Sequence, residues 1–138
     1  MIVLDTNVLS ALMRAQPDPK VVQWLDKQPA ESIWTTSITL FESRYGLALM
    51  PECKRRTLLE EVFESILSED LEGRILDFDQ AAAERAALIA ARRKREGQPV
   101  DMRDTQIAAI CEVRNATLAT RNTRHFSDLM TPVINPWE

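Results

Sequence analysis

Three acidic side chains, Asp5, Glu42 and Asp104, occupy positions for which the sequence predicts an interior or ligand-facing location. Asp5 directly follows the apolar run 2–4, which is typical of a strand buried on both faces of a parallel sheet. Open α/β sheets bind their ligands at the carboxyl ends of such strands. We therefore expect the Asp5 carboxylate at the ligand-binding edge of the sheet.

Glu42 belongs to a predicted helix over residues 37–50. On a helical wheel it falls inside an apolar stripe that consists of Ile38, Phe41, Tyr45 and Leu49. Because apolar stripes pack against the protein, this pattern predicts that Glu42 also faces inward.

Asp104 lies in the first turn of a helix predicted over residues 101–114. Its helical spacing places it on the stripe of Ile107, Ala108 and Cys111. Asp101 is the predicted N-cap of this helix. Asp104 is therefore expected on the inner face as well.

Together these three carboxylates favour a divalent cation site. Buried carboxylates are costly unless they are paired or bound to metal, and neighbouring like charges raise one another's pKa. Oxygen ligands without His or Cys favour Mg²⁺ or Mn²⁺ over zinc. Such a site can activate water and stabilise charge on a phosphodiester. Further oxygen-bearing side chains are expected at the ends of the first and fourth strands: Thr6, Asn7, Thr120 and Asn122.

Each acid also has a structural interpretation. Asp5 fits an Asx-turn or a helix cap. Asp101 and Asp104 have the spacing of a capping pair. Glu42 can pair with Arg44 or with a distant arginine. The metal-site hypothesis fails only if all three acids have these structural roles at once.

Composition narrows the class of protein. The chain has 138 residues and 45% hydrophobic content, which predicts one globular domain over residues 1–138. Cys53 and Cys111 suit neither a disulfide scaffold nor a zinc site, and the single histidine, His125, excludes a mechanism that uses a His pair. We expect no signal peptide, no membrane span and a cytoplasmic location. The net charge of −4 means that polyanions must bind through local patches.

The remaining pattern alternates strands with helices. Strands are predicted over residues 2–4, 32–36, 74–78, 117–120 and 133–134. Helices are predicted over residues 8–13, 18–29, 37–50, 51–69, 79–96 and 101–114. This order predicts a three-layer α/β fold with a parallel sheet of about five strands between helices.

The motifs I-V-L-D-T-N around Asp5, S-I-T-L-F-E ending at Glu42 and D-T-Q-I-A-A from Asp104 resemble the PIN-domain family. The resemblance continues through Leu118-Ala119-Thr120-Arg121-Asn122 and covers essentially the whole chain. It is strongest with the toxins of bacterial toxin–antitoxin pairs, in the VapC branch with its FitB and StbB relatives.

This resemblance implies a Mg²⁺- or Mn²⁺-dependent endoribonuclease with a PIN-like fold, acting on RNA such as tRNA or rRNA. Asp5, Glu42 and Asp104 would hold the metal, and Thr6 or Thr120 would orient ligands or water. Many members carry a fourth acid at the position of Asn122, so the substitution leaves open one ion or two.

The resemblance also implies partners. These are a cognate antitoxin of the VapB or FitA kind, operator DNA contacted mainly through that antitoxin, and a second copy of the chain in a homodimer. Among the cations, Arg121 and Arg124 are predicted to contact RNA because they follow the fourth strand, and Arg93 is a further candidate. His125 is interpreted as a structural or surface group.

Two other functions remain open on the sequence. A HAD-like phosphatase also places an Asp after its first strand, but it needs a second acid two residues later, where this chain has Asn7. A non-catalytic PIN scaffold within a DNA-binding regulatory complex would explain the missing fourth acid, but not the other three acids.

Overall fold

A five-stranded parallel sheet forms the centre of the molecule. The computed structural model describes residues 1–138. Its strands are β1 (Ile2–Leu4), β2 (Ile33–Thr36), β3 (Ile75–Leu76), β4 (Thr117–Ala119) and β5 (Val133–Ile134), in the spatial order β3-β2-β1-β4-β5. Every neighbouring pair is parallel, which confirms the predicted sheet. The fourth strand ends at Ala119, so Thr120 lies just past the strand.

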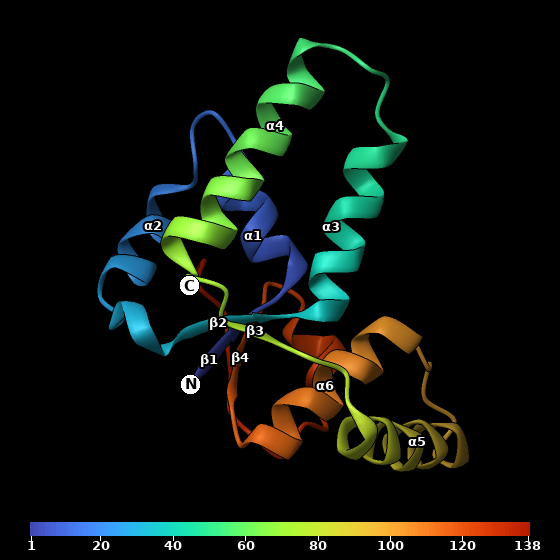
Figure 1. Cartoon of the computed structure of the whole chain (residues 1–138). Helices are drawn as coiled ribbons and strands as arrows, with labels where there is room; N and C mark the ends of the chain where they lie inside the picture. Colours follow the sequence, from blue (N-terminus) through green and yellow to red (C-terminus); the bar gives the residue numbers. More distant parts are fainter.

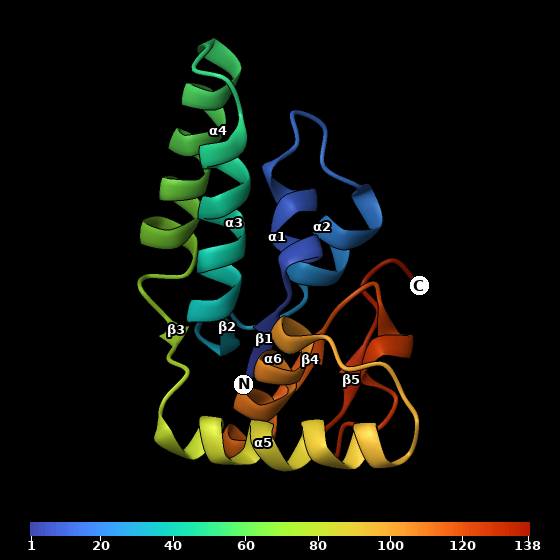
Figure 2. The same cartoon turned by 90° about the vertical axis from the view of Figure 1, so that its right-hand side faces the viewer.

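Helices cover both faces of this sheet (Figures 1 and 2). On one side lie α1 (Thr6–Met13), α2 (Pro19–Asp26), α3 (Ser37–Leu49) and α4 (Lys54–Ser65), and on the other lie α5 (Gln80–Arg95) and α6 (Met102–Arg114). A hydrophobic core lies on each face of the sheet, and alternate strand residues point into the two cores. Val3 packs on the α5–α6 side and Leu4 on the α1–α4 side. Burying such a side chain contributes about 1.5–3 kcal/mol. The three-layer α/β prediction is therefore confirmed.

Local sequence signals determine most helix ends. Asp18, Asp79 and Asp101 cap α2, α5 and α6, each by accepting a hydrogen bond from a backbone N–H in the first turn. Gly97, at φ +71°, follows the end of α5, in the left-handed conformation that glycine adopts without strain. Asp101 is thus the N-cap that the sequence predicted, and α2 and α5 begin within one residue of the starts predicted at 18 and 79.

Two helix predictions were wrong in detail. The helix expected from Pro51 begins at Lys54 and passes at Ser65 into a π-helical turn, η2 (Ile66–Asp70). Most of the apolar stripe of α3 does not face the core: Phe41, Tyr45 and Leu49 are 55%, 50% and 67% exposed, and only Ile38 packs against it.

The buried positions of α3 are Thr39 and Leu47, which are a small polar residue and an aliphatic one. The helical wheel therefore predicted the wrong buried face, because three of the four apolar residues that it selected are exposed.

No helix of the chain is both long enough and apolar enough to cross a membrane.

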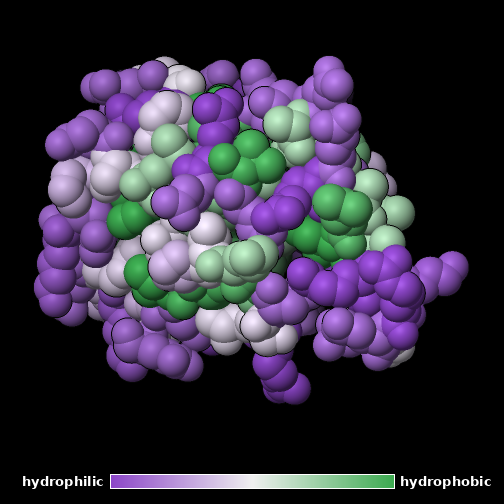
Figure 3. Space-filling view, turned by 90° about the horizontal axis from the view of Figure 1, so that it is seen from below, coloured by the Kyte–Doolittle hydropathy of each residue, from purple (hydrophilic) through white to green (hydrophobic).

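The face seen from below carries apolar patches enclosed by hydrophilic side chains (Figure 3).

Candidate metal centre at the carboxyl edge of the sheet

The three predicted acids line one pocket. Asp5 follows β1, Glu42 projects from α3 and Asp104 from the first turn of α6, and all three border a hollow of about 380 Å³. Its other walls are Thr6, Asn7, Ser10, Arg14, Arg121, Asn122 and Trp137. The three acids, which lie up to 99 positions apart in sequence, are thus brought together at the carboxyl edge of the sheet, where parallel α/β proteins bind ligands.

Asp5 is the most buried member of this group, with 4% of its surface exposed. It is the N-cap of α1, and its Oδ1 accepts a 2.8 Å hydrogen bond from the Thr6 backbone N–H. Its Oδ2 accepts a 2.8 Å hydrogen bond from the Thr120 hydroxyl. The capping interpretation of Asp5 is therefore correct, but it uses one oxygen and leaves the carboxylate within the pocket.

Glu42 is held by two groups from other helices. Its Oε1 accepts a hydrogen bond of 3.0 Å from the Thr6 hydroxyl, and its Oε2 lies 3.3 Å from Arg103 Nη1 on α6. Its side chain is 21% exposed, so Glu42 lies at the pocket rather than in the core. The predicted pairing with a distant arginine is correct, and that arginine is Arg103.

Asp104 pairs with a residue that the sequence analysis did not place in the site. His125 Nδ1 lies 3.0 Å from Asp104 Oδ2. His125 belongs to the short η3 helix (Thr123–Phe126) that follows β4. Its position three residues after Asn122 was the only sequence signal, and that signal did not indicate which acid it meets.

Burial and neighbouring charges raise the pKa of two acids of this pocket. Burial is the main cause that raises the pKa of Asp5 to about 6, against opposing hydrogen bonds from Thr120 and Thr6, and the charges of Asp104 and Glu42 raise it further. Burial also raises the pKa of Asp104, followed by the charge of Asp101. The pocket therefore concentrates negative charge that its own hydrogen bonds only partly compensate.

The donor chemistry of this pocket fits a hard divalent cation. Carboxylate, hydroxyl and amide oxygens converge on it, and these are the ligands that Mg²⁺ and Mn²⁺ prefer. As the side chains stand, however, no three Asp, Glu, His or Cys residues are close enough together to enclose one ion. Glu42 instead pairs with the Arg103 guanidinium, and Asp104 pairs with the His125 imidazole.

The remaining predicted residues surround the acids. Asn7 Oδ1 accepts a 3.1 Å hydrogen bond from the Arg121 backbone N–H, and Asn7 Nδ2 donates a 3.3 Å hydrogen bond to Thr120 Oγ1. The Arg121 guanidinium lies 4.9 Å from the Trp137 ring centroid, a cation–π contact that keeps the cation at the rim. Asn122 borders the pocket and is exposed.

The structure argues against the prediction that Arg93 contacts RNA. Its side chain is 5% exposed, and it makes a two-pronged ion pair with Asp128 at 2.8 and 2.7 Å. Arg93 therefore joins α5 to the segment after η3. Arg124, by contrast, is exposed.

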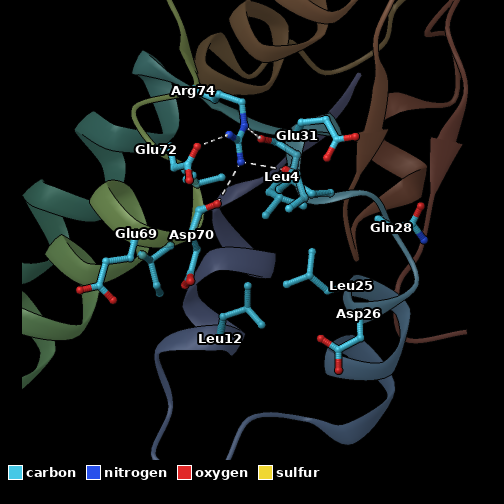
Figure 4. Close-up of a pocket in the computed structure, with 14 residues that line it drawn as sticks. Leu4, Leu12, Leu25, Asp26, Gln28, Glu31, Glu69, Asp70, Glu72 and Arg74 are labelled. Carbon is cyan, nitrogen blue, oxygen red and sulfur yellow. Dashed lines mark hydrogen bonds and ion pairs between the residues drawn. The ribbon is translucent and has the colours of Figure 1, made fainter.

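A second acid-rich pocket lies between α2, η1 (Ala30–Ser32) and η2 (Figure 4). Its acidic residues are Asp26, Glu31, Glu69, Asp70 and Glu72. All of these are exposed, and Arg74 lies among them with hydrogen bonds to the carbonyls of Ile33, Ala30 and Asp70. This pocket has a floor of aliphatic side chains and carries none of the predicted site residues.

Fold and site together define a three-layer α/β protein with an acidic pocket at the strand ends, and the comparisons identify its family. The PIN-domain family matches residues 2–130. The chain is 41% identical over 138 residues to the VapC ribonuclease Y4jK of Sinorhizobium fredii, covering 100% of this chain and 99% of the relative. It is 39% identical over 137 residues to the toxin FitB of Neisseria gonorrhoeae, covering 99% of both.

A solved structure of FitAB bound to an IR36 DNA fragment is similar with a TM-score of 0.90 and 38% identity, covering 100% of this chain and 96% of that one. The chain belongs to the PIN-domain family. This assignment leaves the HAD-like phosphatase hypothesis without support.

Proposed function

We propose that this protein is a metal-dependent endoribonuclease that acts as the toxin of a toxin–antitoxin pair. The observation that carries the proposal is the convergence of Asp5, Glu42 and Asp104, from three separate elements, on one pocket. Similarity to a VapC ribonuclease and to the toxin FitB over nearly the whole chain supports the same activity.

In this proposal the three acids hold Mg²⁺ or Mn²⁺, and the neighbouring polar groups hold the acids. The Thr6 hydroxyl orients Glu42, and the Thr120 hydroxyl orients Asp5. A bound divalent cation would supply an activated water and neutralise charge on the phosphodiester. Asn122 can offer an amide oxygen at the same pocket, which leaves one or two ions open.

The RNA would reach this pocket past Arg121. Its exposed guanidinium is fixed against Trp137 and stands at the rim, where it can contact a phosphate. The acidic net charge of the chain makes such local cations the main electrostatic attraction for a polyanion.

A cognate antitoxin is the proposed inhibitor, because the similar FitAB structure contains such a pair bound to DNA. A chain of hollows leads away from the acid pocket and ends in an apolar groove between α1 and α4. Met13, Leu58, Leu59 and Val62 line this groove, with Arg14 and Arg55 at its rim. Such a groove suits an amphipathic segment with acidic flanks. The resulting complex would bind operator DNA mainly through the antitoxin and repress its own operon.

A homodimer is proposed through the unpartnered stripe of α3. Phe41 and Tyr45 stack with their ring centroids 6.0 Å apart, and with Leu49 they expose apolar surface that has no partner within the chain. Exposed apolar patches of this kind mark protein interfaces. A second copy would bury them.

The alternative is a non-catalytic PIN scaffold within a regulatory complex. The observation in its favour is that Glu42 and Asp104 already face Arg103 and His125. The substitution of the fourth acid by Asn122 points the same way.

One experiment separates the two functions. Antitoxin-free protein is titrated with Mg²⁺ in the presence of a structured RNA, and cleavage is followed for wild type, Asp5→Ala and the exposed control Asp26→Asn. We expect cleavage that depends on Mg²⁺, is lost in Asp5→Ala and is retained in Asp26→Asn. No cleavage by wild type, or equal cleavage by wild type and Asp5→Ala, would support the scaffold.

A further inference from the structure

A second hollow adjoins the acid pocket on the other side of Asp104. It has a volume of about 360 Å³, and none of its lining residues is hydrophobic. Asp104 borders both hollows, so a ligand in the second one lies directly beside the proposed metal centre. Its size is at the lower end of small-ligand sites, which suits one nucleotide unit.

The acids of this second hollow are already engaged. Asp128 is neutralised by Arg93 and Arg92, and the resulting hydrogen bonds lower the pKa of Asp128. Asp101 caps α6 by accepting the Asp104 backbone N–H at 2.9 Å. Asp104 itself pairs with His125.

Arg93 also braces the floor of the hollow. It donates to Thr105 Oγ1 at 3.3 Å and to the His125 carbonyl at 3.2 Å. Because the Arg93 side chain is 5% exposed and bonded on several sides, the floor is rigid and close to neutral in charge.

The side chains that remain free in this hollow can bind the phosphate and the hydroxyl groups of a nucleotide. Arg124 is exposed on η3 and makes no ion pair, so its guanidinium is available to a phosphate. Gln98 and Ser127 are exposed, and their side chains make no hydrogen bond within the chain, so they can bind hydroxyl groups. The one aromatic ring of the lining, the His125 imidazole, is bonded to Asp104, and no Phe, Tyr or Trp is present as a platform for a base.

We propose that this hollow, defined by Arg124, Gln98 and Ser127 beside Asp104, binds the sugar–phosphate of the nucleotide next to the scissile bond. The inference rests on the proposed ribonuclease function and adds a subsite to it. Arg124 binds the phosphate, and Gln98 and Ser127 bind ribose hydroxyls, including the 2′-OH that distinguishes RNA from DNA. Binding at this subsite is independent of base sequence.

The test measures binding separately from catalysis. The dissociation constant of a fluorescein-labelled single-stranded RNA is determined in EDTA, with antitoxin-free full-length protein, over a series of salt concentrations. We expect Arg124→Ala to weaken binding about tenfold and to lower the slope of log K against log [salt] by about 0.7, as the loss of one phosphate contact on single strands predicts. Arg124→Lys should retain most of the affinity.

The matched control is Arg114→Ala, which removes an exposed arginine at the far end of α6. It should leave the dissociation constant unchanged. Equal losses in Arg124→Ala and Arg114→Ala would show a general charge effect and overturn the proposal. An unchanged RNA affinity of Arg124→Ala together with weaker antitoxin binding would assign Arg124 to the protein partner and also overturn it.

A second pair of substitutions tests the ribose contacts. Gln98→Ala combined with Ser127→Ala should reduce the preference for RNA over DNA of the same sequence, and an unchanged preference would refute these contacts. If RNA is not cleaved but its binding depends on Arg124, the ribonuclease proposal fails and the subsite stands. If RNA is cleaved but Arg124→Ala binds it as wild type does, the subsite fails and the ribonuclease proposal stands.

Discussion

Two of the acid-rich pockets, the one at the strand ends and the one between α2 and η2, differ in the state of their carboxylates. In the pocket at the strand ends, Asp5 is 4% exposed and its pKa is raised to about 6. In the pocket between α2 and η2, every acid is exposed, and Arg74 is bonded to backbone carbonyls at one side (Figure 4). The larger number of acids is in the second pocket, where burial and the charge of Glu69 raise the pKa of Asp70, but only the first holds an acid as deeply buried as Asp5.

This difference shows what makes a cluster of acids suitable for a metal. Exposed carboxylates are solvated by water and gain little from a cation, because their charges are screened. Partly buried carboxylates that repel one another gain much more, since a cation removes a penalty already present in the fold. The pocket of Asp5 meets this condition, and the pocket of Arg74 instead uses its cation to join loops.

The largest expected effect separates the two pockets by catalysis. Glu42→Gln and Asp104→Asn should each lower RNA cleavage by about 10²- to 10³-fold or more, because each removes a charged ligand from the proposed metal centre. Glu69→Gln and Asp70→Asn in the other pocket should leave the rate unchanged. Single-turnover cleavage assays measure the rates, and circular dichroism confirms folding. Similar losses in all four variants would remove the distinction between the pockets.

Arg74→Ala should have the next largest effect, and it should act on stability. The substitution removes hydrogen bonds of 2.8, 2.8 and 2.9 Å to three carbonyls, so we expect the free energy of unfolding to fall by about 2–4 kcal/mol. Arg103→Ala, which removes a half-exposed ion pair, should cost less than about 1 kcal/mol. Urea unfolding in EDTA measures both. Equal costs would mean that the two arginines have the same structural role.

Asp5→Asn should stabilise the metal-free protein at neutral pH. The raised pKa means that the folded state binds the Asp5 proton more tightly than the unfolded chain does. Wild type therefore loses stability as the pH rises from about 4 through about 6, and the variant does not, which makes the variant more stable by about 3 kcal/mol at pH 7.5. Urea unfolding at several pH values tests this. A variant that is less stable than wild type at pH 7.5 would show that the hydrogen bonds of Asp5 outweigh the cost of burying its charge.

Arg103→Ala should have the smallest effect, which is a change in metal affinity. Arg103 Nη1 lies 3.3 Å from Glu42 and competes with a cation for that carboxylate. Its removal should tighten Mn²⁺ binding by about three- to tenfold, as the loss of one partly exposed ion pair predicts. Calorimetric titration of wild type and variant measures the change. Weaker binding in the variant would show that Arg103 supports the site.

Much of the fold followed from the sequence because local signals determine it. Apolar runs such as 2–4 predicted the strands, and Asp18, Asp79 and Asp101 predicted helix starts. The buried face of α3 could not be predicted, because Phe41, Tyr45 and Leu49 of its apolar stripe are exposed. Glu42 therefore reached the site prediction through an argument whose premise was wrong.

The contacts of the site depend on pairings that no local pattern contains. His125 meets Asp104 across 21 positions, and Arg93 meets Asp128 across 35. Both pairings depend on the path of the chain after β4, where η3 turns back toward α6. A run of basic residues at the end of α5 gave no indication that Arg93 alone is buried.

The central claim is that the pocket of Asp5 binds a divalent cation and the pocket of Arg74 does not. Calorimetric titration of antitoxin-free protein with Mn²⁺ tests it directly, with wild type, Asp5→Asn and the double variant Glu69→Gln/Asp70→Asn. We expect saturable binding in wild type, its loss in Asp5→Asn and its retention in the double variant. Binding that survives in Asp5→Asn, or that disappears in the double variant, would contradict the account.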